Sequence, residues 1–300
     1  MRRDSRESSL LGYTGLMSRR RRNLKRYWVV ILLAIVAAIV GLIFWPDNDS
    51  KNLNTAVEQS SSANQPGVEQ PSFPVINLQA TIDTWVAKQS GRAGIVVYDL
   101  ANKKIVASIN PDRQYFTASL YKLYVAYIGY QKIADGTYEA NDPYLSGYSR
   151  GKCLDAMIRD SYSPCGEKMW SELGKQQLTE KLKTYGLSNT SMTGLYTSAE
   201  DAALILARLF ERRDLTEAYT NAYLSSLKDQ DVKFRTGLPS GFAKSAVYNK
   251  VGWNGTVEWH DTAIVTLPNR RSYVITVLSE NIGSAQVASL GQAIEARLTQ

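Results

Sequence analysis

Residues 117–133 read TASLYKLYVAYIGYQKI, and no other stretch of the chain constrains the fold as tightly. Its apolar spacing from Ser119 to Ile133 predicts a buried helix that ends near Asp135. Lys122 lies one turn beyond Ser119, on the same helical face. A serine hydroxyl needs a base to become a good nucleophile, and burial lowers the pKa of a lysine amine. The stretch therefore predicts a serine–lysine pair at the start of a core helix.

The tetrapeptide S-x-x-K alone does not identify a nucleophile, because it occurs three times in the chain. The copies lie at 119–122, 149–152 and 225–228, and only the first opens an apolar helix. The second copy overlaps a G-x-S-x-G pattern at 147–151, which is the nucleophile pattern of α/β-hydrolases and would need His260 as its base. The residues before this pattern predict a loop and not the required buried strand, so we favour the first copy.

The order of predicted elements indicates the fold class. Strands near both ends of the domain surround a mainly helical middle. This order predicts an α+β fold, in which an antiparallel sheet is flanked by the terminal helices and an all-helical lobe lies across a cleft. The predicted elements are a helix at 77–89, a hairpin of strands at 93–100 and 104–109, helices through 153–228, strands at 246–252, 257–267 and 273–279, and a helix at 284–298.

Two further motifs follow the serine–lysine pair. Residues 160–164 read DSYSP after a short predicted helix at 154–158, and residues 250–253 read KVGW at the end of a predicted strand. The order S-x-x-K, S-x-S, K-x-G resembles the penicillin-recognising serine enzymes, above all class A β-lactamases and D-alanyl-D-alanine peptidases. The resemblance covers residues 77–300 and implies a β-lactamase/transpeptidase-like fold.

The resemblance implies a role for each motif residue. Ser119 would be the acylated nucleophile and Lys122 its base, while Ser161 would pass a proton to the leaving nitrogen. Lys250 would hold the substrate carboxylate, and the backbone N–H groups of Ser119 and Trp253 would form the oxyanion hole. The expected substrate is a β-lactam or a D-Ala-D-Ala-type peptidoglycan stem peptide, cleaved at an amide bond.

The sequence also departs from this family at several positions. Ser163 stands where the family usually has asparagine, and Val251 where it usually has threonine. Ser163, Gly252 and Trp253 remain the expected substrate-binding residues. Class A enzymes place a deacylating glutamate in their Ω loop, whereas residues 186–198 (GLSNTSMTGLYTS) hold no acid.

Two glutamates lie near this loop in the sequence. Glu180 is expected on a helix face, and Glu167 follows the middle motif. We therefore expect acylation with slow deacylation, which favours a D-alanyl-D-alanine carboxypeptidase/transpeptidase or a weak β-lactamase over an efficient one. The alternative is that the domain is not an enzyme and only binds penicillin or the cell wall.

The formal net charge of +7 belongs to one short segment. Residues 1–26 hold nine lysines and arginines against Asp4 and Glu7, so the rest of the chain is neutral. Residues 27–45 (YWVVILLAIVAAIVGLIFW) carry no charge and, at about 1.5 Å per residue, match the ~30 Å core of a bilayer. The basic flank predicts a cytoplasmic N-terminus and an extracytoplasmic domain. The charge thus indicates a single-pass anchor in the cell membrane and no nucleic-acid partner.

The polar residues 46–76 are predicted to form a disordered linker between this anchor and the catalytic domain at 77–300. A cleaved signal peptide is the alternative to an anchor. It fits less well, because the long apolar run is followed by no small-residue cleavage site. We expect a monomer.

Cys153 and Cys165 lie on either side of Ser161. An extracytoplasmic domain permits a disulfide, which would tie the loop of Ser161 to the helices around it. Two separate buried thiols are the alternative. Two cysteines and His260 do not make a zinc ligand set, so we predict no metal and no cofactor.

Overall fold

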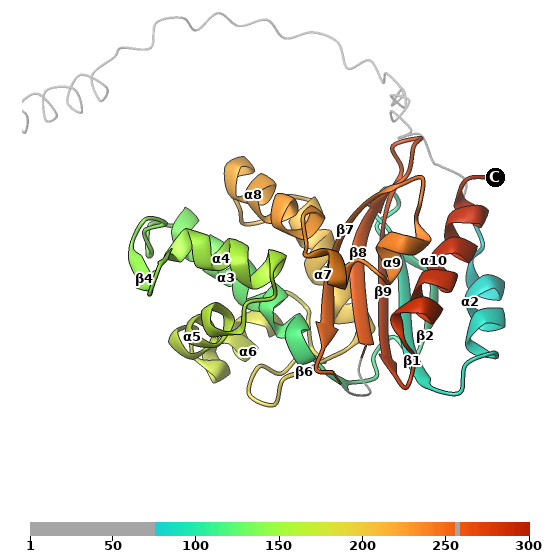
Figure 1. The fold of residues 1–300 in the computed structure, drawn as a ribbon, viewed down its shortest axis with the longest axis horizontal. Coiled ribbons are helices and arrows are strands. Elements are labelled where there is room, and N and C mark those ends of the chain that lie inside the picture. The colour runs from blue at the N-terminus through green and yellow to red at the C-terminus, as the bar shows by residue number, and fades with distance from the viewer. Residues whose placement is uncertain (1–75, 256–258) are drawn as a thin grey trace, which may run out of the picture. The chain divides into compact units, whose positions relative to one another are not determined.

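The computed structural model describes residues 76–255 and 259–300, and its centre is a five-stranded antiparallel sheet (Figure 1). The strand order β2-β1-β9-β8-β7 places the N-terminal hairpin beside the last strand of the chain and leaves β7 at one edge. The strands are β1 Arg92–Asp99, β2 Lys104–Ile109, β7 Ala246–Trp253, β8 Trp259–Thr266 and β9 Ser272–Glu280.

Both faces of this sheet are buried, because its strands alternate between two apolar cores. Ile95 and Val97 of β1 belong to the core that the terminal helices cover, whereas Val96 between them belongs to the core of the helical lobe. This alternation is the period-two pattern of a strand. The first face is covered by α2 (Gln79–Val86), α9 (Leu238–Gly241) and α10 (Ser284–Leu298).

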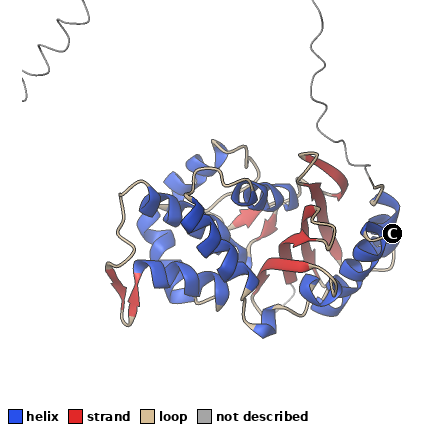
Figure 2. Cartoon of the chain, turned by 90° about the horizontal axis from the view of Figure 1, so that it is seen from above, coloured by secondary structure: helices blue, strands red, loops and turns tan. Residues whose placement is uncertain are grey.

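Six helices form a lobe on the other face of the sheet. Figures 1 and 2 show this helical lobe next to the sheet. Tyr124 and Tyr127 of α3 are fully buried in this lobe, so α3 is its central helix. The helices are α3 Tyr121–Ala134, α4 Arg150–Arg159, α5 Ser163–Leu173, α6 Lys175–Lys183, α7 Ala199–Phe210 and α8 Glu217–Lys228. The predicted α+β fold with a helical lobe is confirmed.

The helix predicted from Ser119 begins two residues later. Ala118 has a φ of +43°, and residues Ala118–Leu120 form a short 3₁₀ turn, η1, before α3 begins at Tyr121. The tighter turn places Ser119 ahead of the α-helix and not inside it. A second 3₁₀ turn, η2, covers Val232–Phe234.

The loop predicted before Ser149 is a small hairpin of β4 (Pro143–Leu145) and β5 (Tyr148–Ser149). Gly147 makes the turn with a φ of +81°, a conformation that glycine adopts without a steric cost. A further short pair joins β3 (Tyr115–Phe116) to β6 (Tyr196–Thr197). The expectation of an irregular loop was therefore wrong.

The tail, apolar span and linker predicted at 1–26, 27–45 and 46–76 lie outside the described residues, apart from Ile76. Within 76–255 and 259–300, no helix combines the length and the hydropathy needed to cross a bilayer.

Candidate active site

Ser119 lies on η1, between the short strand β3 and the core helix α3. The Thr117 N–H donates to Leu195 O at 2.7 Å, and the Leu120 N–H donates to Thr117 O at 2.9 Å. These two bonds hold the turn on both sides of Ser119. Lys122 follows in the first turn of α3, and its Nζ donates to Ser119 Oγ at 3.1 Å.

The other partners of the Lys122 Nζ atom come from a second segment, residues 161–163. This Nζ donates to Ser161 O at 2.7 Å, to Ser163 Oγ at 3.1 Å and, at 3.4 Å, to Ser161 Oγ. From β7, Lys250 Nζ donates to the same Ser161 Oγ at 3.0 Å and to Val251 O at 2.9 Å. The Ser161 hydroxyl therefore lies between two lysines.

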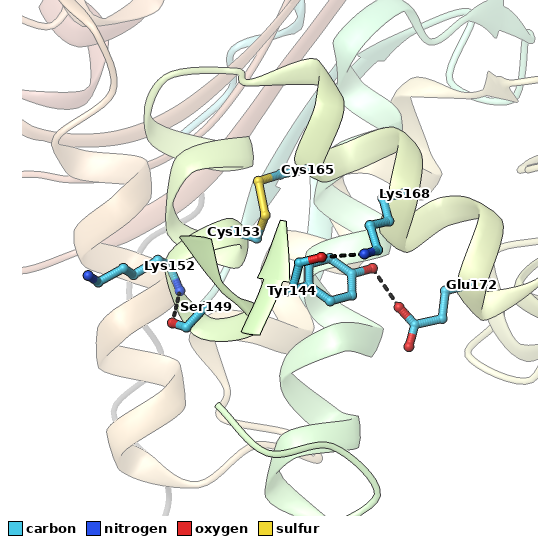
Figure 3. Close-up of a disulfide and its surroundings, with 7 residues drawn as sticks. All are labelled: Tyr144, Ser149, Lys152, Cys153, Cys165, Lys168 and Glu172. Carbon is cyan, nitrogen blue, oxygen red and sulfur yellow. Dashed lines mark hydrogen bonds between the residues drawn. A yellow bond between two sulfur atoms is a disulfide. The ribbon is translucent and has the colours of Figure 1, made fainter. Parts of the chain in front are cut away.

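The loop that carries Ser161 is held from several sides. Ser161 has a φ of +54°, and the next N–H, of Tyr162, donates to Ala156 O at 3.1 Å. Cys153 of α4 and Cys165 of α5 form a disulfide with Cα atoms 5.2 Å apart (Figure 3). The bridge ties together the two helices on either side of the loop, so it restrains the position of Ser161.

Two glycines allow close approaches at this site. A Cβ at Gly166 would lie 2.9 Å from Lys122 Cε, so glycine leaves room for the lysine side chain in its present position. A Cβ at Gly252 would lie 2.6 Å from Thr117 O, so its absence lets the end of β7 pack against the turn of Ser119. Trp253 comes next, with 45% of its surface exposed.

Burial sets the electrostatics of both lysines. It lowers the pKa of Lys122 to about 8, and the charge of Glu167 opposes this shift. Burial also lowers the pKa of Lys250 well below its usual value; the charge of Lys122 adds to this effect and that of Asp261 opposes it. A lysine whose pKa is near neutrality can be a proton acceptor at physiological pH.

A family model for the β-lactamase enzyme family matches residues 77–298 of this sequence. The chain belongs to this family. No curated protein matches the sequence.

Solved structures share the fold of this β-lactamase family member at low sequence identity. The structure of PBP-A is 20% identical and covers 77% of this chain and 98% of its own, with a TM-score of 0.68. An ancestral (GNCA) class A β-lactamase is 18% identical over 72% of this chain and 98% of its own, with a TM-score of 0.67. PenP from Rhodopseudomonas palustris, a putative class A β-lactamase in its own description, is 18% identical over 73% and 99%, with a TM-score of 0.66. These likenesses support the β-lactamase/transpeptidase-like fold.

The loop at 186–198 holds no acid of its own and is bound by an acid that lies outside it. Thr190 and the Asn189 N–H both bind the buried Asp201 carboxylate, at 2.7 and 2.9 Å, so this acid anchors the loop. Burial raises the pKa of Asp201 to about 6. Glu180 lies on the exposed face of α6 with Gln176 and Lys183.

Glu167 is the acid whose charge acts on the serine–lysine pair. It lies on α5 with an exposed side chain. Burial is the larger cause at both neighbours, lowering the pKa of Lys122 and raising that of Tyr121; the negative charge of Glu167 opposes the first shift and adds to the second. Because the side chain is exposed, water reaches it. Glu167 is thus the acid to test for an effect on deacylation.

His260 has a structural role. Its Nδ1 accepts the Ser279 N–H at 3.0 Å, so Nε2 carries the proton and donates to Phe116 O at 2.7 Å. Ser149, the rival nucleophile, accepts the Lys152 N–H and caps α4. Ser149 and His260, the nucleophile and the base of the α/β-hydrolase interpretation, therefore each make structural hydrogen bonds and not the bond that this interpretation needs.

Sequence reasoning missed several buried carboxylates, among them Asp201 and Asp261. Asp261 follows His260 within the apolar strand β8, and a charged residue in such a run was the available signal. Among residues 76–255 and 259–300, no group of three histidine, cysteine, aspartate or glutamate side chains could hold a metal ion.

Proposed function

We propose that this protein is a serine hydrolase that forms an acyl-enzyme at Ser119 with β-lactams or D-Ala-D-Ala-type peptides. The arrangement of two buried lysines around Ser161, with Lys122 Nζ 3.1 Å from Ser119 Oγ, carries the proposal. A binding domain with no chemistry would not need all four of the residues Ser119, Lys122, Ser161 and Lys250. The family membership supports the same class of reaction.

In the proposed reaction, Ser119 Oγ attacks the amide carbon and its proton moves to the neutral amine of Lys122. The new O–C bond replaces the C–N bond, and Ser161 gives its proton to the leaving nitrogen. Ser161 regains a proton from a lysine, since both lysines donate to its Oγ. The carboxylate of the substrate binds Lys250, and the N–H groups of Ser119 and Trp253 hold the oxyanion.

The proposed substrate contacts come from both sides of the site. Ser163 Oγ lies 3.1 Å from Lys122 Nζ at the start of α5, where its hydroxyl can bind a substrate amide. Gly252 and Trp253 lie at the end of β7, next to the turn of Ser119. The amide would therefore bind between α5 and β7.

We propose that deacylation is slow, because residues 186–198 supply no acid to activate water. Such an enzyme suits a D-alanyl-D-alanine carboxypeptidase or transpeptidase, or a weak β-lactamase. A mutant of PBP-A has been solved as an acyl-enzyme complex with penicillin G; it is 20% identical, with a TM-score of 0.67. That likeness supports a long-lived acyl-enzyme as a property to test.

We also propose that residues 27–45 anchor the chain in the cell membrane, with the catalytic domain outside. The apolar run with its basic flank supports this topology. The disulfide between Cys153 and Cys165 supports it independently, because such bonds persist in oxidising compartments.

Intact-mass spectrometry after mixing with penicillin G tests the acyl-enzyme. We expect the protein mass to rise by the mass of one penicillin, because ring opening adds the whole molecule, and to return slowly. Rapid loss of the adduct, with hundreds of turnovers per second, would contradict slow deacylation. No adduct at all would favour a binding domain.

A further inference from the structure

The loop at 186–198 contacts the turn that carries Ser119. The Thr117 N–H donates to Leu195 O at 2.7 Å, and next to this bond β6 pairs with β3. Leu195 has a φ of +56°, which is unfavourable for leucine and persists only where the surrounding contacts hold it. The position of the Ser119 turn therefore depends on the contacts that hold this loop.

A buried carboxylate on α7 holds the first part of this loop. Asp201 has a relative exposure of 1%, and its Oδ2 accepts the Asn189 N–H at 2.9 Å and the Thr190 hydroxyl at 2.7 Å. Burial raises the pKa of Asp201 to about 6, and the hydrogen bonds from Thr190 and Asn189 oppose this shift. At neutral pH the carboxyl is therefore ionised, and it can only accept hydrogen bonds.

Buried hydroxyls continue from this carboxylate to the core helix α3. Thr190 Oγ1 lies 2.9 Å from Thr197 Oγ1, which in turn lies 2.5 Å from Tyr124 OH. Each hydroxyl carries one proton, and Thr190 donates its own to Asp201. Thr197 must therefore donate to Thr190, and Tyr124 to Thr197. Burial raises the pKa of Tyr124, so its hydroxyl keeps the proton that it donates. We call Tyr124, Thr197 and Thr190 the hydroxyl chain; all its bonds point toward Asp201.

The loop at 186–198 is thereby bound to both members of the serine–lysine pair. At one point the hydroxyl chain joins it to Tyr124, which lies two residues after Lys122 on α3. At another point Leu195 O holds the N–H of Thr117, two residues before Ser119. A buried hydroxyl that loses its acceptor is costly, so the hydroxyl chain favours one position of the loop. The helix of the base and the turn of the nucleophile are held to the same segment.

We infer that Asp201 and Thr190 are positioning residues, which hold the loop at 186–198 against α3 and so keep Ser119 Oγ aligned with the amine of Lys122. The effect on acylation rests on the proposed function, whereas the hold on the loop can be measured with no substrate present. Without the Thr190 hydroxyl, Asp201 loses one of its donors and Thr197 loses its acceptor in the hydroxyl chain. The loop then opens more often and releases the Thr117 N–H.

Amide hydrogen exchange of the full-length protein, followed by NMR, tests the hold on the loop. Thr190→Val replaces the hydroxyl by a methyl group of the same shape. We expect the Thr117 N–H to exchange about five- to tenfold faster, as the loss of one buried hydrogen bond predicts. Thr190→Ser keeps the hydroxyl and should exchange as the wild type does. Unchanged exchange in folded Thr190→Val would overturn the inference, and Thr190→Ala removes the same hydroxyl if the valine variant does not fold.

Ser245→Ala is the matched control. Glu295 on α10 is also buried, and like Asp201 it accepts one backbone N–H and one hydroxyl, from Lys244 at 3.1 Å and from Ser245 at 2.6 Å. This acid lies on the face of the sheet that is opposite to the helical lobe. We expect Ser245→Ala to leave the exchange of the Thr117 N–H unchanged. A similar acceleration would show a general effect of losing a hydroxyl–carboxylate bond, and would contradict the inference.

Stopped-flow acylation by penicillin G at several concentrations tests the alignment of the serine–lysine pair. We expect Thr190→Val to lower the limiting acylation rate by about tenfold and to leave the half-saturating concentration nearly unchanged, because alignment and not binding is lost. Thr190→Ser should restore the rate. An unchanged limiting rate in a variant whose loop exchanges faster would overturn the positioning role. If penicillin does not label the wild type but the Thr117 exchange follows the Thr190 hydroxyl, the proposed function fails and the hold on the loop stands.

Discussion

The same tetrapeptide, S-x-x-K, begins two helices of the lobe and does different work in each. At 119–122, the lysine is fully buried and its Nζ bonds the serine hydroxyl. At 149–152, the lysine side chain is exposed, and it is the backbone N–H of Lys152 that donates to Ser149 Oγ, at 3.3 Å (Figure 3). The first is a candidate nucleophile with its base, and the second is a helix cap.

The difference lies in what surrounds each helix start. Ser119 precedes α3 on a 3₁₀ turn that is packed against β7, where a buried amine finds few partners except hydroxyls and carbonyls. Ser149 ends a hairpin in an extended conformation, with a ψ of 167°, which is the geometry of an N-cap. The S-x-x-K tetrapeptide can therefore form a nucleophile–base pair only where the fold buries its lysine away from water.

The largest expected effect separates the two serines. Ser119→Ala should abolish labelling by a fluorescent penicillin, because no oxygen remains to be acylated. Ser149→Ala should keep the labelling and lose about 1 kcal/mol of unfolding free energy through the lost cap. Gel fluorescence measures the labelling, and urea unfolding measures the unfolding free energy. Labelling that survives Ser119→Ala and disappears with Ser149→Ala would reverse the assignment.

The pH dependence of acylation tests the two lysines. Burial lowers the pKa of Lys122 to about 8. The neutral amine is the base, so the acylation rate should rise with pH to a midpoint near 8. Lys122→Ala should slow acylation by about 10²–10⁴-fold, as loss of a general base does, while Lys152→Ala should leave it unchanged. Stopped-flow labelling between pH 6 and 9 gives the rates, and a flat profile in the wild type would argue against Lys122 as the base.

The disulfide joins α4, which begins at the Ser149 cap and carries Cys153, to α5, which follows the loop of Ser161 and carries Cys165. Replacing Cys153 and Cys165 together by serine should lower the unfolding free energy by about 3 kcal/mol, as expected for a loop of this length. Acylation should also slow, since the loop of Ser161 loses its restraint. Urea unfolding and labelling rates check both effects. A normal rate in the folded variant would mean that hydrogen bonds alone position Ser161.

Much of this comparison could be predicted from sequence, and the rest depended on distant contacts. The apolar run after Ser119 was enough to predict α3, because local spacing determines which helix face is buried. The meeting of Lys122 and Lys250 at Ser161 was expected only through a resemblance. Local pattern carries no information on residues 39 and 89 positions apart. The hairpin before Ser149 was missed, since three- and two-residue strands are too short to show a period.

The smallest expected effect concerns two glycines, one beside each lysine. In Gly166→Ala, the new Cβ would meet Lys122 Cε at 2.9 Å, so the lysine side chain must shift from its position beside Ser119 Oγ. We expect acylation to slow by about tenfold, since loss of alignment in a reacting pair costs rate even when both groups remain. In Gly151→Ala, the new Cβ would lie 3.2 Å from Ala140 O, remote from Lys122, and acylation should stay unchanged.

Stopped-flow labelling of both glycine variants, beside their thermal unfolding, separates misalignment from instability. If Gly166→Ala and Gly151→Ala are equally stable and are acylated at equal rates, the close packing around Lys122 does not determine where the lysine amine lies. A slower rate in Gly166→Ala alone would show that the S-x-x-K pair of α3 depends on close packing that the pair of α4 does not need.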